Sequence, residues 1–412
     1  MEKAILVGLD INNDEYFIET MEELKNLAFA CDIEVCNQLT QKKDAPTANF
    51  YIGEGKVDEL NDMINLCDAN VVIFNDELSP SHIRNLEQKL EIKVIDRTVL
   101  ILDIFAKRAK TKEAILQVEL AQSQYYLPRI IGMYKSLSRQ KSGTGSKGPG
   151  EQQLELDRRI LRDKITKLKK ELKELVKVRR TQRLKRNTSL IKTVALAGYT
   201  NSGKSSLMNA IIKETTHNDV DEVFSKDMLF ATLETRTRKI TLNNNNNFLL
   251  TDTVGFIRKL PHDLIEAFKS TLEEINEASV ILHVIDVANP NYENQIQAVE
   301  NVLQDIGIHD IPIFHVYNKI DLIKELPVIS KDNSIFVSAK DNINIDQLLS
   351  KINNAIYKVF SVDMFIPFDE GEIYSDLMEN TKVIKTDYKP DGIHVLAELN
   401  QYYFEKYKEY IK

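Results

Sequence analysis

Short apolar runs alternate with helix-like segments through the first hundred residues of the chain. The apolar runs are AILVGL, IEVCNQL, ANVVIF and IKVID, and helix-like stretches such as residues 15–30 and 57–66 lie between them. This alternation is typical of β-α-β units around a mainly parallel sheet. We therefore predict an N-terminal α/β domain over residues 1–97.

Two helical patterns follow, separated by a loop. Over residues 100–126 the apolar residues near one helix face are Ile104, Ala114, Val118, Ala121 and Tyr125. We expect Pro128 to end that helix or to lie just past it. About 20 residues rich in Gly, Ser, Lys and Arg come next, and then a leucine repeat every seven residues, Leu154, Leu161, Leu168 and Leu175, with Ile165 and Leu172 interleaved. These patterns predict an antiparallel helical hairpin over residues 98–190, with its tip loop at about 130–149.

A second α/β pattern covers residues 191–360. Its strand-like runs are TVALAG, FLLTD, VILHVID, IPIFHVYN and SIFVSA. The run LNNNNN, residues 242–247, lies between two strand signals and is interpreted as a polar hairpin turn. Residues 361–412 predict a small C-terminal α/β domain with a Lys-Pro-Asp-Gly turn.

The strand TVALAG leads directly into the sequence GYTNSGKS, which a helix-compatible segment follows. This order and the spacing G-x-x-x-x-G-K-S are those of a phosphate-binding P-loop. Backbone N–H groups would face the phosphates, Lys204 would add a cation at the β and γ oxygens, and Ser205 could ligate Mg²⁺. The predicted nucleotide contacts here are Gly198, Tyr199, Thr200, Asn201, Ser202, Gly203, Lys204 and Ser205.

Three further motifs end later strands in the order that a GTPase requires. DTVG offers an aspartate for Mg²⁺, directly or through water, and a glycine N–H for the γ-phosphate. In N-K-x-D the Asp321 carboxylate can accept hydrogen bonds from N1–H and the exocyclic amine of guanine, so we predict GTP rather than ATP. The contacts are Asp252, Thr253, Val254, Gly255, Asn318, Lys319, Ile320, Asp321, Ser338, Ala339 and Lys340.

Some functions of this predicted site stay open on spacing alone. Thr232, Thr235 and Thr237 are all placed where a mobile threonine could complete the Mg²⁺ shell. Phe256 stands where many GTPases have the glutamine that orients the attacking water, so we expect slow hydrolysis until a partner or another residue positions that water. Asn201 matches an asparagine that helps some P-loop GTPases bind K⁺.

Chain length and charge add to this picture. A chain of 412 residues needs more than one core. No run approaches the roughly 18 apolar residues of a membrane helix, so we expect a cytoplasmic protein. Residues 129–186 hold 19 Lys and Arg against 6 Asp and Glu, a net charge of +13, which leaves −21 for the remainder. Such asymmetry favours a nucleic-acid partner over the alternative of a solvated lysine-rich helix face.

The glycines of KSGTGSKGPGE have the spacing G-x-G-x-x-G of a dinucleotide fingerprint. They are Gly143, Gly145 and Gly148, and they follow a basic loop rather than a strand. The fingerprint requires a preceding strand, so we assign the nucleotide to residues 198–205 and the glycines to a flexible, cationic loop.

Three long segments, together with these motifs, closely resemble the HflX family of bacterial ribosome-binding GTPases. They are YIGEGKVDEL at 51–60, AKTKEAILQVELAQSQYYLPR at 109–129 and GPGEQQLELDRR at 148–159. The resemblance implies a multidomain α/β fold of N-terminal α/β domain, long antiparallel helical hairpin, P-loop GTPase domain and small C-terminal α/β domain. It also implies binding of the GTP-bound protein to the large ribosomal subunit and splitting of stalled ribosomes.

The resemblance also assigns residues. The magnesium-binding threonine falls in FATLE and is therefore Thr232, although Glu234 replaces the family's usual aspartate; the expected contacts are Phe230, Ala231, Thr232, Leu233 and Glu234. Lys204, Thr232 and Gly255 are the expected catalytic residues. Phe256 matches the family's phenylalanine, which implies slow intrinsic hydrolysis that the ribosome stimulates.

The tip loop is the expected RNA contact. Its cations can neutralise phosphates and its tyrosine can stack on a base, and the residues are Tyr134, Lys135, Arg139, Lys141 and Lys147. We expect a monomer without a stable DNA partner. The alternatives are a large-subunit assembly or storage factor, and a GTPase that acts on other RNA or at a membrane, where part of the protein would be peripherally bound.

Overall fold

The computed structural model describes residues 2–133, 149–187, 191–215, 230, 236–242, 246–259, 264, 275–327, 333–357, 360–399 and 401–411. The chain divides into two compact units. The first contains Met1–Lys185, Lys226–Glu234 and Val254–Leu272, and the second contains Arg186–Ser225, Thr235–Thr253 and Glu273–Lys412. The predicted multidomain α/β class is confirmed by three separate sheets with helices between their strands. None of the described helices is long and apolar enough to cross a membrane.

The N-terminal sheet is parallel throughout, as predicted. Its strands follow the order β2-β1-β3-β4 and are β1 (Glu2–Ile11), β2 (Ile33–Lys43), β3 (Val71–Phe74) and β4 (Lys93–Asp96). The helices between them are α1 (Phe17–Ala30), α2 (Glu54–Cys67) and α3 (Pro80–Leu90). The helix α3 lies between the strand-like runs ANVVIF and IKVID, in keeping with the predicted alternation; Ser79 caps its N-terminus by accepting a hydrogen bond from the His82 N–H.

The helical region after β4 consists of two helices, where the sequence pattern predicted one. They are α4 (Arg97–Arg108) and α5 (Lys112–Met133). The backbone of Ala109 is extended and ends α4, and the Thr111 hydroxyl accepts a hydrogen bond of 3.2 Å from the Ala114 N–H at the start of α5. An apolar stripe continues across such a break, so periodicity alone did not reveal it.

Pro128 lies inside α5, so the expectation that it ends the helix was wrong. The neighbouring Arg129 explains the continuation. Its guanidinium lies 3.4 Å from the centre of the Tyr125 ring, donates to the Tyr125 carbonyl at 2.9 Å, and donates to the carbonyl of Leu78 at 2.9 Å. These contacts hold the helix on both sides of a proline, which costs about 3 kcal/mol in a helix interior.

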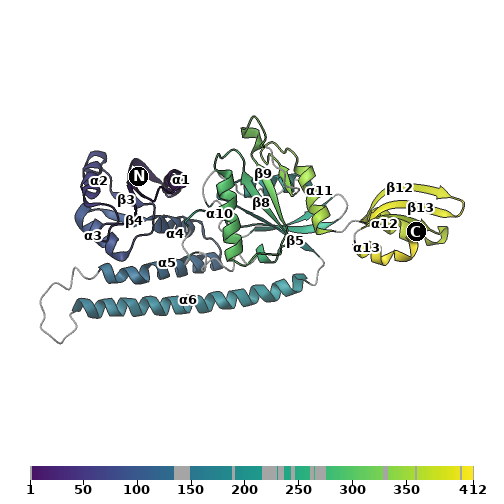
Figure 1. The fold of residues 1–412 in the computed structure, drawn as a ribbon. Coiled ribbons are helices and arrows are strands. Elements are labelled where there is room, and N and C mark those ends of the chain that lie inside the picture. The colour runs from purple at the N-terminus through teal and green to yellow at the C-terminus, as the bar shows by residue number, and fades with distance from the viewer. Residues whose placement is uncertain are drawn as a thin grey trace. The chain divides into compact units, whose positions relative to one another are not determined.

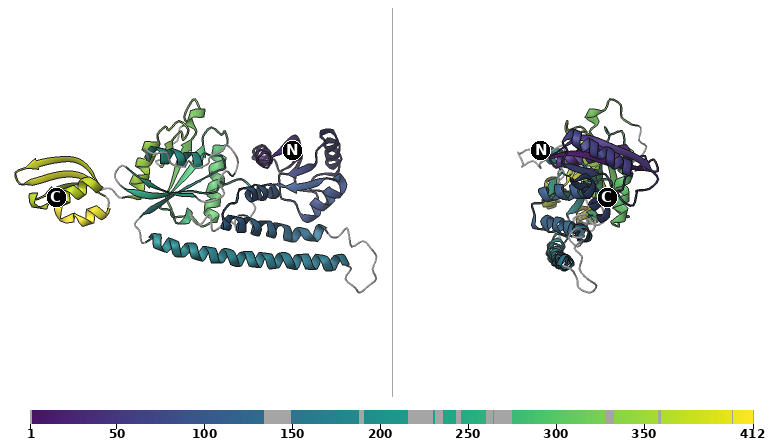
Figure 2. Two further views of the ribbon diagram at one scale, coloured as in Figure 1. Left: turned by 180° about the vertical axis from the view of Figure 1, so that it is seen from behind. Right: turned by 90° about the vertical axis from the view of Figure 1, so that its left-hand side faces the viewer.

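The helices α5 and α6 (Pro149–Asn187) lie side by side as an antiparallel hairpin in the views of Figures 1 and 2. Leu116 and Leu120 of α5 pack with Leu168 of α6, and Lys164 forms an ion pair of 3.3 Å with Glu119. At 1.5 Å per residue, the 39 residues of α6 extend about 58 Å. The predicted hairpin is thereby confirmed; its tip residues lie outside the described ranges.

The sheet of the second unit has the strand order β10-β9-β8-β5-β7-β6, and only β6 is antiparallel to its neighbour. Its strands are β5 (Lys192–Gly198), β6 (Arg236–Thr241), β7 (Asn247–Asp252), β8 (Val280–Asp286), β9 (Ile313–Asn318) and β10 (Ser334–Phe336). Thr241 pairs with Asn247, so the asparagine run does connect a β-hairpin.

Helices cover both faces of this sheet. The helices α7 (Lys204–Thr215) and α11 (Ile345–Ile356) bury their apolar residues in one cluster with Leu196, Leu282 and Val316. The helix α10 (Tyr292–Asp305) contributes Tyr292 and Ile296 to a smaller cluster with Ile285 and Tyr317. Because side chains alternate along a strand, these two clusters lie on opposite faces.

The C-terminal part is a small α/β structure, as predicted. Its antiparallel strands have the order β11-β13-β12 and are β11 (Phe360–Ile366), β12 (Lys382–Lys389) and β13 (Gly392–Leu399), with helices α12 (Gly371–Asn380) and α13 (Gln401–Lys406). Gly392 closes the β12–β13 turn at a φ of +152°, where a Cβ would lie 2.8 Å from the Ile366 carbonyl oxygen.

Candidate nucleotide-binding site

The P-loop connects β5 to α7 at the carboxyl edge of the sheet. Gly198 has a φ of +155° and Gly203 a φ of +91°. A Cβ on Gly198 would lie 2.3 Å from the Val284 carbonyl oxygen, and one on Gly203 would lie 2.3 Å from Nδ2 of Asn318. Real Cβ contacts are longer, so both positions require glycine. Asn201 lies between them in the left-handed region, with a φ of +63°.

Lys204 is folded over its own loop. Its ammonium donates to the carbonyl oxygens of Gly198 at 3.0 Å and Tyr199 at 2.8 Å, and the side chain is buried. Burial lowers the pKa of Lys204 to about 8, and the nearby Asp252 carboxylate acts in the opposite direction. Burial therefore disfavours the charged form of Lys204, and a bound anionic group such as a phosphate would stabilise that form.

Ser205 and Asp252 offer two oxygen atoms at the first turn of α7. The Ser205 hydroxyl donates to Oδ2 of Asp252 at 2.6 Å. Asp252 reaches this edge because it pairs in register with Leu196 of the parallel strand β5. Thr253, the residue after Asp252, is fixed by its hydroxyl, which donates to the Leu196 carbonyl at 2.6 Å. A hydroxyl and a carboxylate are hard oxygen donors, so the pair fits a Mg²⁺ ion.

Asn318 joins the P-loop to the loops at the ends of β9 and β10. Its Nδ2 donates to the Ser202 carbonyl at 3.0 Å, and its Oδ1 accepts from the Ala339 N–H at 3.0 Å. The side chain is 2% exposed. Residues from three separate sequence motifs are thus held together by one buried amide.

Asp321 and Lys319 of N-K-x-D are held by Ser338, which follows β10, and by Asp286 at the end of β8. The Ser338 hydroxyl donates to Oδ1 of Asp321 at 2.7 Å and orients the carboxylate. Lys319 has a φ of +68° and donates to Asp286 at 2.7 Å. The sequence motifs did not identify Asp286. The only available signal was its position as the last residue of a strand-like run, the kind of position that holds ligand-binding residues in open α/β sheets.

The other predicted contacts differ in their surroundings. Within the P-loop Tyr199, Thr200 and Ser202 are buried, whereas Ile320 and Ala339 are half-buried and Lys340 is exposed. Phe230 is buried against Phe105, with ring centres 4.7 Å apart and nearly perpendicular planes. The remaining predicted residues lie outside the described ranges: Ala231, Thr232, Leu233, Glu234, Tyr134, Lys135, Arg139, Lys141 and Lys147.

The segment that follows DTVG forms part of the first unit. Val254 and Phe256 are buried, which places Gly255 between two buried side chains along the chain. The buried phenyl ring of Phe256 has no group that could hydrogen-bond a water molecule. In the described chain this residue therefore cannot perform the role of the usual glutamine.

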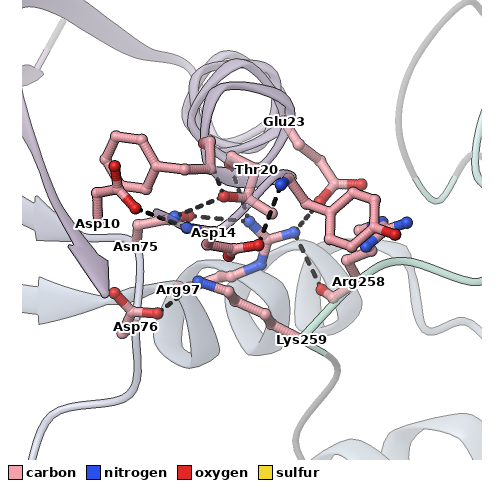
Figure 3. Close-up of polar contacts among 11 residues, drawn as sticks. Asp10, Asp14, Thr20, Glu23, Asn75, Asp76, Arg97, Arg258 and Lys259 are labelled. Atoms are coloured by element: carbon pink, nitrogen blue, oxygen red, sulfur yellow. Dashed lines mark hydrogen bonds and ion pairs between the residues drawn. The ribbon is translucent and has the colours of Figure 1, made fainter. Parts of the chain in front are cut away.

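Arg258 and Lys259, immediately beyond, contact polar residues of the N-terminal domain (Figure 3). The Arg258 guanidinium lies 3.6 Å from the centre of the Tyr16 ring, and the Lys259 ammonium is 2.6 Å from Oδ1 of Asp76. Sequence reasoning did not find these residues, because only the folded chain brings positions 16, 76 and 258 together.

Arg97 lies at the centre of this cluster and is 2% exposed. Its guanidinium forms an ion pair with Glu23 and donates to Oδ1 of Asn75 at 3.1 Å and to the carbonyl of Thr20 at 3.2 Å. It also donates to the main-chain carbonyl of Arg258 at 3.1 Å. A buried charge with this many partners is held in a single orientation.

The P-loop, the Ser205–Asp252 pair and the guanine-type N-K-x-D loop on this sheet define a P-loop GTPase. Three family models match consecutive parts of the chain: GTP-binding GTPase N-terminal at residues 18–106, GTP-binding GTPase Middle Region at 108–186 and 50S ribosome-binding GTPase at 193–319. GTPase HflX of Caldanaerobacter subterraneus subsp. tengcongensis is 46% identical over 411 residues, which cover 100% of this chain and 94% of that protein. The chain belongs to the HflX family of GTPases.

Other similar proteins include GTPase HflX of Escherichia coli strain K12. It is 39% identical over 398 residues, which cover 95% of this chain and 92% of that protein. Among solved structures, a GTP-binding protein from the hyperthermophilic archaeon Sulfolobus solfataricus in complex with GDP is 26% identical. That match covers 86% of this chain and 99% of the archaeal one, with a TM-score of 0.45.

Proposed function

We propose that the protein binds GTP with Mg²⁺ at the edge of the β5–β10 sheet and hydrolyses it slowly until a partner is bound. The Asn318 amide supports this proposal most directly, because it ties the phosphate loop to the loop that holds Asp321. In this proposal Lys204 contacts the β and γ oxygens, Gly255 donates its N–H to the γ-phosphate, and Asp321 accepts from guanine.

Magnesium would neutralise charge on the phosphates and on the departing group. We assign its protein ligands to Ser205 and Thr232, with Asp252 acting through a water molecule, and the oxygen pair of Ser205 and Asp252 supports the assignment. We also propose K⁺ beside the phosphates at Asn201. Equal hydrolysis rates in KCl and NaCl would show that the potassium assignment is wrong.

We further propose that the GTP-bound protein acts on the large ribosomal subunit and splits stalled ribosomes into subunits. Two observations support this. The match to the model described as 50S ribosome-binding GTPase covers residues 193–319, and nearly all of α6, one arm of the long hairpin, lies in the region 129–186 with a net charge of +13. Its predicted tip contacts with RNA are Tyr134, Lys135, Arg139, Lys141 and Lys147. A monomeric, cytoplasmic protein is consistent with this proposal.

A sucrose gradient separates splitting from a role in large-subunit assembly or storage. Intact ribosomes mixed with the protein and a non-hydrolysable GTP analogue should yield free subunits, whereas GDP should not. An unchanged profile, with the protein still co-sedimenting with the large subunit, would favour the assembly role. If purified ribosomes neither bind the protein nor accelerate its hydrolysis, the ribosomal proposal as a whole is wrong.

A variant of the tip loop tests the RNA assignment separately. Replacing Lys141 and Lys147 with glutamate should weaken ribosome binding, because two phosphate-neutralising cations become anions. The affinity for GTP should stay unchanged, since residues 198–205 hold the nucleotide. A loss of GTP affinity instead would contradict both assignments.

A further inference from the structure

A row of polar side chains crosses the sheet face that α10 covers. His283 of β8 is the register partner of His315 of β9, which in turn pairs with Ser334 of β10. Partners in register in a parallel sheet project to the same face. The row lies opposite the face of α7, because the flanking residues Leu282 and Val284 belong to the core cluster that contains α7.

Two of these side chains and one carboxylate converge. The His283 and His315 ring centres are 5.5 Å apart, with planes inclined by 42°. Nε2 of His315 lies 3.3 Å from Oε1 of Glu300, which α10 supplies from above the sheet. One ligand atom from each of the three residues can be chosen so that all lie within 4.8 Å of one another.

We propose that His283, Glu300 and His315 form a second metal site, for a borderline divalent cation such as Zn²⁺. Two imidazoles and a carboxylate are a ligand set of open zinc sites, and Mg²⁺ prefers oxygen ligands alone. With ligand bonds of about 2.0–2.2 Å, the edge of a zinc tetrahedron is about 3.4 Å. The Glu300–His315 distance of 3.3 Å is close to that edge, and the His283 ligand atom, within 4.8 Å of the other two, has to move closer to them to bind the same ion.

Both imidazoles of the proposed site are buried beside an apolar row of the sheet. His283 is 1% and His315 is 7% exposed, and the next row toward the carboxyl edge consists of Ile285, Tyr317 and Phe336. A divalent cation bound by both rings and by Glu300 would join α10 to two strands of the sheet.

The site is accessible from one side. Glu300 keeps 29% of its side chain exposed, so a cation can enter past it and keep a water molecule as its fourth ligand. His283 and His315 each stand three residues before a residue of the guanine loop region, Asp286 and Asn318. A bound cation would therefore stiffen the two strands that end in those residues.

Calorimetric titration of the full-length chain with ZnCl₂, in excess Mg²⁺ and GDP, tests the proposal. Cys31, Cys36 and Cys67 are free thiols, so the titration is made in a chain in which serine replaces all three. We expect one equivalent of Zn²⁺ to bind. Glu300→Gln should weaken binding at least ~10-fold, and His315→Asn should abolish it, because each removes a ligand.

Matched controls come from the same helix and domain. Glu293→Gln in α10 and His309→Asn, both at exposed positions, should leave zinc affinity unchanged. Unchanged GDP affinity in Glu300→Gln shows that this variant is folded, so the test does not depend on the more buried His315. Cobalt in place of zinc should give the visible bands of a tetrahedral site without thiolate charge transfer.

Two results would overturn the proposal. One is that the parent chain binds zinc no more tightly than the Glu300→Gln chain does. The other is an affinity within twofold of the parent chain in both ligand variants, which would place the cation elsewhere. In either case His283 and His315 are buried core residues that bind no metal, and nucleotide binding at the P-loop is unaffected.

Discussion

Arg97 donates a hydrogen bond from Nη2 to the main-chain carbonyl of Arg258, with 3.1 Å between the atoms, although the two residues are 161 positions apart in sequence. Arg258 follows DTVG by three residues, so the chain just beyond that motif is fastened to a buried guanidinium at the start of α4. A change in the position of this segment would have to break a charge-assisted bond, which is stronger than one between neutral groups.

Replacing Arg97 should destabilise the first unit strongly. Arg97→Met retains the length of the side chain but removes the cation that pairs with Glu23, and breaking a buried pair in this way costs about 3–5 kcal/mol. Urea unfolding with a probe in the N-terminal domain measures the loss. The double variant Arg97→Met/Glu23→Gln should recover part of it; a loss below about 1 kcal/mol would contradict the central role of Arg97.

Arg258→Ala should accelerate GTP hydrolysis in the absence of ribosomes. The side chain stacks on Tyr16, and such a cation–π contact contributes about 0.5–1 kcal/mol, which corresponds to about a 2- to 5-fold change in rate. We expect this because order–disorder changes of such segments accompany the nucleotide cycle of GTPases, and the Arg258 contact would oppose a rearrangement of the segment after DTVG. Single-turnover phosphate release measures the rate. Arg238→Ala, at an exposed position of β6, is the control, and a slower rate in Arg258→Ala would contradict the expectation.

Gly203→Ala and Gly307→Ala form a matched pair. Both glycines have a positive φ, +91° and +86°, so both substitutions strain the backbone by about 1 kcal/mol. Only the Cβ at position 203 would meet another atom, Nδ2 of Asn318 at 2.3 Å. We expect a loss of GDP affinity of at least ~100-fold in Gly203→Ala, with unchanged affinity in Gly307→Ala. Equal affinities measured by fluorescence titration would show that the close approach is unimportant.

Asp321→Asn should exchange the base preference. The carboxylate accepts from two donors of guanine, whereas an asparagine amide can donate to the extra carbonyl of xanthine. A site that hydrogen-bonds a ligand group rejects an analogue without it by large factors, and we expect a loss of at least ~100-fold for GDP. Competition of GDP and XDP against a labelled nucleotide measures the change. A variant that still prefers GDP would remove Asp321 from the base site.

Nucleotide affinity should fall above pH 8. The pKa of Lys204 is lowered to about 8 by burial, against the opposing influence of Asp252, and a bound phosphate would raise it again. Binding above pH 8 therefore takes up a proton, and the GDP dissociation constant should rise by up to ~10-fold per pH unit there. Calorimetry in two buffers of different ionisation enthalpy should detect proton uptake at pH 9 and none at pH 6.5.

In the nucleotide-free protein, the lowered pKa of Lys204 makes stability increase with pH, whereas it makes nucleotide affinity decrease. The pKa of Lys204 in the folded chain lies below its ordinary value of 10.5, so the unfolded chain binds more protons between about pH 8 and pH 10.5. The contribution of this group to the free energy of unfolding consequently rises with pH in that window. Lys204→Met should remove that rise from a pH series of urea unfolding curves.

The nucleotide loops could be predicted because each is a contiguous motif at a strand end. Residues 198–205 and 318–321 contain their glycines, lysine and aspartate in fixed spacing, and adjacency along the chain is enough to interpret them. Asp286 could not be predicted in the same way. Its contact with Lys319 exists only because β8 lies next to β9, and strand order is a property of the whole sheet.

Helix boundaries were predicted less well, for a different reason. Pro128 is a strong local signal for a helix end, and contacts of Arg129 with Tyr125 and Leu78 overrule it. The break between α4 and α5 has no proline or glycine and leaves the apolar stripe nearly continuous. Local propensity gives way to tertiary contacts in the first case and carries no signal in the second.

The buried amide of Asn318 makes the site selective for the distance between the phosphates and the base of its ligand. Its two polar atoms bond to the Ser202 carbonyl and the Ala339 N–H, and a planar amide cannot move one atom without the other. The separation between the phosphate end and the base end is therefore fixed by a single rigid group. The site therefore binds a base and phosphates that are covalently linked at this separation, so guanosine and pyrophosphate supplied together would not replace GDP.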